Sequence, residues 1–186
     1  MNKQKAYKFR LYPNLEQRVL FEKTFGCSRF IWNQMLADKI AHYKKTGETL
    51  KNTPAQYKKD FPWLKEVDSL ALCNVQLNLN KAYKSFFQSG FGFPRFKSKK
   101  TAQSYKTNSQ KGLITLLNRK VRLPKIGWVK VKAHRQPKGL IKSATISKTA
   151  TGKYFISILC EEEIPLLPKT NSNLGIDLGL ENFAIL

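Results

Sequence analysis

The sequence predicts an α+β fold in which a small antiparallel OB-like β-barrel is interrupted by a helical insertion. One strand-like segment opens the chain, two long helical patterns follow it, and short segments rich in β-branched and aromatic residues come after Pro94. A strand that stands alone cannot satisfy its backbone hydrogen-bonding groups. We therefore expect the first strand to pair with strands formed after residue 105, which makes the helices between them an insertion.

The first strand covers residues 5–12 and alternates between apolar and polar or basic positions. One side carries Tyr7, Phe9 and Leu11, and the other side carries Lys8, Arg10 and Tyr12. This period of two is typical of a half-exposed strand, here with a basic outer face. Pro13 ends the strand, and Asn14 can cap the helix that follows.

The helical insertion is predicted over residues 14–94. From residue 15 to about residue 43, apolar residues recur at steps of three and four, which indicates a helix that Gly26 kinks or splits. A second long helix is predicted to begin near Ser69, the candidate capping residue after Asp68, and to be ended by Gly90, Gly92 and Pro94.

The rest of the barrel is predicted over residues 95–165. Its candidate strands, separated by turn residues, are residues 113–117, 119–123, 127–133, 140–147 and 153–161. Trp128, Lys130 and Lys132 share one face of their strand, and basic groups beside aromatic residues resemble the nucleic-acid surface of OB-like folds. The alternative is that Trp128, Tyr154 and Phe155 simply fill the core.

The charge distribution indicates a polyanionic partner. The formal net charge is +22, and no Asp or Glu lies between Asp68 and Glu161, a stretch that holds 19 Lys and Arg residues. Solvated surfaces normally intersperse both signs of charge, so a stretch of this kind is suited to lie along phosphates.

Other classes of protein are disfavoured by the sequence. No apolar stretch approaches the ~18 residues of a membrane span, and the basic N-terminus has no apolar core of a secretion signal. Cys27, Cys73 and Cys160 are far apart and form no CxxC pair, so we expect reduced thiols and no zinc site made within this chain. We expect a protein of the bacterial cytosol or nucleoid that does not bind membranes.

Eight sequence blocks occur in the order found in the OrfB/TnpB proteins of bacterial insertion sequences, and the chain resembles that family from residue 3 onward. The blocks are RLYPN, GCSRFIWN, PWLKEVDSLAL, AYKSFF, GFPRFKSK, LPKIGWVKV, GKYFISI and LGIDLGLENFAIL. The family consists of RNA-guided DNA endonucleases thought to be ancestral to type V CRISPR effectors. The resemblance implies guide RNA and double-stranded target DNA as partners.

The resemblance also implies a domain organisation. It assigns residues 1–13 and 95–165 to a barrel (wedge) domain, 14–94 to a helical recognition domain, 166–172 to a linker, and 173–186 to the start of an RNase H/RuvC-like nuclease domain. Asp177 matches the first catalytic carboxylate of that nuclease domain, which holds Mg²⁺ with two further carboxylates. Those carboxylates and the zinc ribbon of the family lie beyond residue 186. We therefore expect a truncated nuclease domain, weak Mg²⁺ binding, no DNA cleavage by this chain alone, and a missing C-terminal nuclease half as a partner.

The GIDLG segment alone leaves another alternative, because actin-like ATPases also carry a Gly-x-Asp-x-Gly strand and turn. Those proteins usually continue with Thr or Ser, whereas Leu180 follows here. The upstream blocks favour the nuclease family, since motifs are confirmed by context.

Charge and resemblance together give a set of candidate nucleic-acid contacts. They are Tyr7, Lys8, Arg10, Arg29, Asn33, Ser69, Leu70, Cys73, Asn74, Arg95, Lys97, Lys99, Lys100, Thr107, Asn108, Lys125, Lys130, Lys132 and Arg135. The resemblance places Ser69–Asn74 and Thr107–Asn108 where the family recognises a short duplex motif. Cys73 stands where Gln is common in relatives, and a thiol cannot make a bidentate contact to adenine. The alternative for Leu70 and Cys73 is helix packing.

Two other functions stay open from the sequence. The chain could act as a catalytically inactive RNA- or DNA-binding regulator, or as a stand-alone helix-turn-helix DNA-binding protein that uses residues 15–45. A requirement for RNA separates these alternatives, because RNase treatment would abolish guided binding and spare helix-turn-helix binding.

Overall fold

A computed structural model describes residues 1–100, 103–110, 112–165 and 175. The predicted linker, the predicted start of the nuclease domain and Asp177 lie outside the described residues. The magnesium site expected at Asp177 therefore stays a prediction.

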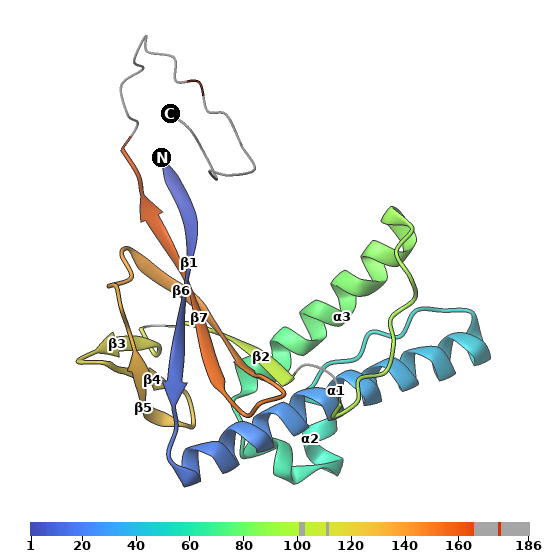
Figure 1. Cartoon of the computed structure of the whole chain (residues 1–186). Coiled ribbons are helices and arrows are strands. Elements are labelled where there is room, and N and C mark those ends of the chain that lie inside the picture. The colour runs from blue at the N-terminus through green and yellow to red at the C-terminus, as the bar shows by residue number, and fades with distance from the viewer. Residues whose placement is uncertain (101–102, 111, 166–174, 176–186) are drawn as a thin grey trace, which may run out of the picture.

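The described chain has an α+β fold, as predicted, built on one curled antiparallel sheet (Figure 1). The strands are β1 (Asn2–Tyr12), β2 (Gln103–Asn108), β3 (Thr115–Leu117), β4 (Lys120–Leu123), β5 (Gly127–Lys132), β6 (Leu140–Lys148) and β7 (Tyr154–Glu163). Their order in space is β2-β6-β7-β1-β5-β4-β3. Since β2 and β3 end this order, the described sheet is a half-barrel, and its likeness to a closed OB barrel stays a prediction.

The first strand occupies the position that the sequence predicts for it. β1 pairs with β7 along nearly its whole length, from Asn2 opposite Glu163 to Leu11 opposite Tyr154. Its last residues also pair with β5, with Tyr12 opposite Lys130. The backbone of β1 is thus satisfied by strands that lie more than a hundred residues later in the chain.

Two long helices form the insertion between β1 and β2. They are α1 (Leu15–Thr46) and α3 (Ser69–Ser89), with the short α2 (Tyr57–Asp60) and the 3-10 helix η1 (Pro62–Lys65) between them. Asn14 caps α1 through a capping box with Gln17. The cap of α3 is Asp68 and not the predicted Ser69, which is the first residue of the helix. α1 runs without interruption through Gly26, so the prediction of a kink or split at that glycine is wrong.

The later strands follow the predicted segments, with one omission. β2 was not among the predicted strands, because its residues QSYKTN place only Tyr105 and Thr107 toward the interior and carry little apolar signal. Asn118 and Arg119 join β3 to β4, and both have a positive φ, as a type I′ hairpin turn requires.

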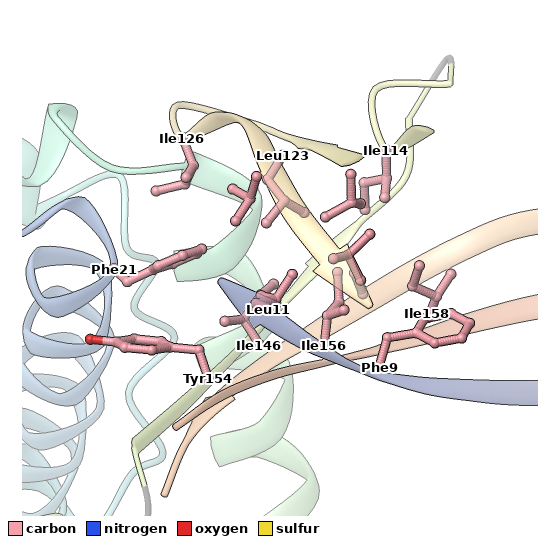
Figure 2. Close-up of a cluster of buried hydrophobic side chains, with 14 of the residues drawn as sticks. Phe9, Leu11, Phe21, Ile114, Leu123, Ile126, Ile146, Tyr154, Ile156 and Ile158 are labelled. Atoms are coloured by element: carbon pink, nitrogen blue, oxygen red, sulfur yellow. The ribbon is translucent and has the colours of Figure 1, made fainter. Parts of the chain in front are cut away.

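Two hydrophobic clusters hold these layers together. The larger cluster fills the inner face of the sheet, where Phe9, Leu11 and Ile156 from the strands are joined by Phe21 from α1 (Figure 2). The second cluster, with Ile31 and Leu72 at its centre, packs α1 against α3. Because α1 contributes to both clusters, it fixes the helical block to the sheet.

The approach of Gly139 to β7 gives a stability prediction. Gly139 has a φ of +76°, and a Cβ there would lie 2.1 Å from the backbone oxygen of Glu161. Gly152 has a similar φ of +78° but open space around it. We expect Gly152→Ala to lower the free energy of unfolding by about 1–2 kcal/mol through backbone conformation alone. Gly139→Ala should be clearly more destabilising, because β6 and β7 must move apart.

Urea unfolding of the two variants under identical conditions measures this difference. Equal decreases would mean that the close approach of Gly139 to β7 carries no energetic cost.

Candidate nucleic-acid interface

The outer face of the sheet gathers basic and aromatic side chains from several strands. Residues directly opposite each other in an antiparallel pair point to the same side of the sheet. We define the basic face as Lys8, Arg10, Tyr12, Lys120, Arg122, Trp128, Lys130, Lys132 and Phe155, which the strand registers bring together. The sequence did not reveal that Lys120, Arg122 and Phe155 belong to this face, since register is set by tertiary structure.

The alternation of β5 shows how sharply the two faces differ. Val129 and Val131 are buried, whereas Lys130 and Lys132 are exposed on the other side. Trp128 lies on that same outer side and is 43% exposed, so the alternative that it is a core residue is wrong. Tyr154 is a core residue, and Phe155 is half-buried on the outer face.

Cations stand directly opposite one another on the basic face. Arg10 is paired with Lys132 across β1 and β5, and Lys130 is paired with Lys120 across β5 and β4. Like charges directly opposite in a sheet are destabilising. This arrangement therefore lowers the stability of the free protein and is relieved by an anion that binds over the face.

The basic face has no counter-charge within the described part of the chain. The ion pairs among the described residues lie outside the basic face. They are Lys5–Glu162 at 3.9 Å, Lys23–Glu66 at 2.7 Å, Lys142–Glu161 at 3.1 Å and Lys148–Glu22 at 2.7 Å. Instead, Lys8 Nζ lies 5.2 Å from the centroid of the Phe155 ring, and the Arg10 guanidinium lies 5.1 Å from that of Tyr12. Arg10 Nε is buried and has no hydrogen-bond partner among the described residues.

Three predicted contacts, Tyr7, Asn74 and Thr107, are buried in the described structure, and their part in binding stays a prediction. Tyr7 is 2% exposed, and its hydroxyl donates to the carboxylate of Glu162. Thr107 is 1% exposed, and its hydroxyl donates to the carboxylate of Asp68. In both cases the hydroxyl hydrogen is used inside the fold.

The bond from Thr107 to Asp68 joins β2 to the first turn of α3, so these two predicted regions do lie together. Asp68 Oδ1 accepts from the backbone N–H of Leu70 at 3.1 Å and caps the helix. Asn74 is buried and donates to the Leu70 carbonyl at 2.8 Å, which gives it a structural role. The remaining predicted residues here are Ser69 and Cys73, which are exposed, and Leu70 and Asn108, which are half-buried.

The alternative of helix packing is therefore wrong for Cys73, because its side chain faces outward. For Leu70, which is half-buried, packing and contact with a ligand both stay open.

A second basic surface follows α3. We define the basic strap as residues 95–100, which include the exposed Arg95, Lys97, Lys99 and Lys100. Trp32 Nε1 donates to the carbonyl of Arg95 at 2.9 Å. The Asn33 side chain donates to the Lys97 carbonyl at 2.9 Å and accepts from the Lys97 N–H at 2.8 Å. Asn33 therefore positions the strap.

The packing of Lys97 on α1 also changes its electrostatics. Its ammonium lies 3.9 Å from the centroid of the Trp32 ring, and desolvation lowers the pKa of Lys97.

Arg29, Asn74 and Lys97 meet around an open pocket of about 220 Å³ between α1, α3 and β2. Arg29 donates to the side-chain oxygen of Gln103 at 3.0 Å. No carboxylate is among the residues that line this pocket in the described structure. Lys125 and Arg135, the last two predicted contacts, lie in the loops that flank β5.

The family model for the helix-turn-helix domain of OrfB from IS605 matches residues 1–48. The chain is 32% identical over its whole length to an Escherichia coli K12 protein named "Putative RNA-guided DNA endonuclease InsQ", and the match covers 48% of that protein. It is 28% identical over 98% of its length to a "Putative RNA-guided DNA endonuclease" from Streptomyces pristinaespiralis, again covering 48% of that protein. A third match, 32% identical, aligns 51% of the chain with 93% of "Virulence protein VsdF" from Salmonella dublin.

The chain belongs to the OrfB/TnpB family. It spans about half the length of the two endonuclease relatives. In this OrfB/TnpB protein the residues matched by the helix-turn-helix model form β1 and the single helix α1, with no turn inside the helix. The stand-alone helix-turn-helix alternative thus has no second helix within the matched residues.

No helix in the described part of this OrfB/TnpB protein combines the length and the apolar character that a membrane crossing needs.

The thiols give a prediction about the first turn of α3. Burial raises the pKa of the Cys27 thiol to about 11 and also raises the pKa of Cys160. Cys73 is exposed. We expect a maleimide at pH 7 to modify Cys73 at least about tenfold faster than the other two thiols, because reactivity needs an accessible thiolate.

Peptide mapping after short labelling identifies the modified thiol, and Cys73→Ser is the control that should abolish fast labelling. Bound nucleic acid should slow the modification of Cys73 if the first turn of α3 faces it. An unchanged rate in the complex would remove this turn from the interface.

Proposed function

We propose that this chain is the guide-RNA- and target-DNA-binding part of a transposon-associated, RNA-guided DNA endonuclease of the OrfB/TnpB family. The observation that carries the proposal is the basic face, where cations stand opposite cations without a carboxylate partner in the described structure. The RNA-guided role itself is taken from the names of the two longest-matching relatives.

A nucleic-acid backbone supplies the missing counter-charge. Each phosphate that pairs with a Lys or Arg of the protein releases a condensed counterion, and this release favours binding. Tyr12, Trp128 and Phe155 lie among these cations and offer apolar rings beside them. Rings interleaved with cations suit a nucleic acid, because bases and sugars can pack where phosphates pair.

The remaining exposed candidates fit a division of roles. In RNA-guided systems, base pairing reads the target sequence, while the protein reads shape, backbone and a short duplex motif. Ser69 and Cys73 are exposed and Asn108 is half-buried where α3 meets β2, and we assign these three residues to the motif. The basic strap and the basic face are assigned to phosphates. A catalytically inactive binding regulator would use the same surfaces.

The test compares two double variants that remove the same charge. Lys130→Ala/Lys132→Ala removes two cations from the basic face, and Lys44→Ala/Lys45→Ala removes two exposed cations from the end of α1. For duplex DNA, log K decreases with log salt concentration, and the magnitude of this slope falls by about 0.9 for each phosphate that the protein no longer neutralises. We expect a fall of close to two units for the first variant and little change for the second.

Fluorescence polarisation across a salt series gives the slopes, and circular dichroism confirms that both variants fold. Equal falls in the two variants would overturn the proposal. Binding would then reflect only the overall positive charge.

A further inference from the structure

The far end of α3 carries a cluster of exposed aromatic rings that the proposed function does not use. We define the aromatic tip as Tyr83, Phe86, Phe87, Phe91 and Phe93, at the end of α3 and in the segment after it. Phe87 is 75% exposed, Phe91 is 68% exposed and Phe93 is 44% exposed. Figure 1 shows this end of α3 pointing away from the sheet, with the next segment running back toward α1.

Four rings of the aromatic tip, those of Tyr83, Phe86, Phe87 and Phe93, are held by contacts with one another. The Phe93 ring meets Tyr83 at 5.6 Å and Phe86 at 5.3 Å between centroids, in both cases edge-on. Phe87 stacks on Tyr83 at 6.4 Å. Tyr83 in turn packs against the cluster between α1 and α3. Such contacts favour one arrangement of the rings over many.

The backbone after α3 is fixed as well. Gly90 takes the left-handed conformation at the helix end, and its N–H donates to the carbonyl of Ser85. Pro94 is buried, and Trp32 binds the carbonyl of Arg95. The segment is thus tied at both ends, so a ligand would meet preformed rings at a low cost in conformational entropy.

The charge of the two segments that carry the rings indicates the class of ligand. Lys81, Lys84, Arg95 and Lys97 lie on the same two segments, and no carboxylate occurs from Ser69 to Lys100. A second copy of this chain would bring its own +22 charge against these cations, which disfavours association between copies. Stacked bases carry phosphates that pair with the cations, whereas the apolar rings alone would suit any apolar partner.

We propose that the aromatic tip is a stacking platform for unpaired bases of single-stranded nucleic acid. This goes beyond the proposed function, which assigns the basic face and the basic strap to phosphates and the junction of α3 and β2 to a duplex motif, and which gives the aromatic tip no role. Stacking needs the flat face of a base and is tolerant of sequence. The aromatic tip therefore reads single-stranded character and not base identity.

The test uses two RNA probes of about 12 nucleotides, which spans a typical single-strand site. One is oligo-uridine, and the other is an abasic strand with the same phosphates and no bases. We expect the chain to bind the base-bearing strand at least about tenfold more tightly than the abasic strand. Phe87→Ala/Phe91→Ala should remove most of this preference and leave the abasic affinity unchanged.

Three further variants make the result specific. Phe87→Leu keeps an apolar side chain without a ring and should reduce the preference, whereas Phe87→Trp should keep it. Leu77→Ala removes an exposed apolar side chain from α3 outside the aromatic tip and should change nothing. Lys130→Ala/Lys132→Ala should lower the affinity for both probes by the same factor. A wrong assignment of the basic face can therefore be distinguished from a wrong assignment of the aromatic tip.

Two results would overturn the inference. One is that the unmodified chain does not prefer the base-bearing strand, or that Phe87→Ala/Phe91→Ala keeps the full preference. The other is self-association in sedimentation velocity that this double variant abolishes, which would make the aromatic tip an interface between copies.

Discussion

The pairing of β1 with two distant strands is the constraint on which the sheet and its basic face depend. In the described sheet, β1 lies between β7 and β5, so the strands β2-β6-β7 and β5-β4-β3 are joined only through it. Arg10 stands at this junction, with Phe155 on one side and Lys132 on the other. The basic face therefore exists only after the N-terminus has paired with strands formed much later in the chain. Closing such a long loop costs conformational entropy, which burial of Tyr7, Phe9 and Leu11 offsets.

The helical block is attached to this sheet by both apolar and polar contacts, and that attachment sets the relation between the binding surfaces. Phe21 and Phe25 from α1 enter the core of the sheet, and Figure 2 shows Phe21 beside Tyr154 and Leu11. Glu22 accepts from Lys148 at 2.7 Å and from the Tyr154 hydroxyl at 2.8 Å, so one carboxylate joins α1 to β6 and β7. Although burial opposes its ionised form, these two partners keep the pKa of Glu22 below its ordinary value. The carboxylate thus stays charged at neutral pH, and the link it makes would be lost as the pH falls through that lowered pKa.

Much of this architecture is visible in the sequence, because it depends on local patterns. The alternation of residues 5–12, the cap at Asn14, and the alternation of Val and Lys in β5 all correspond to the elements observed. The start of α3 was predicted to within one residue, since its cap is Asp68 and not Ser69. What the sequence does not show is set by tertiary contacts. Register decides that Lys120 stands opposite Lys130, and the carboxylates of Glu162 and Asp68 decide that the hydroxyls of Tyr7 and Thr107 are satisfied inside the fold. β2 was missed for the same reason, since its interior residues are recognisable only once β6 and α3 are beside it.

We propose that the chain binds a specific RNA through surfaces built on this sheet. The most direct measurement is to purify the chain without nuclease treatment, wash it at moderate salt, and sequence the RNA that remains bound. The account predicts one discrete RNA species that resists the wash and is reduced when Lys130 and Lys132 are replaced. A heterogeneous mixture that moderate salt removes equally from both proteins would contradict it, and would leave only the net charge of +22 as the cause of binding.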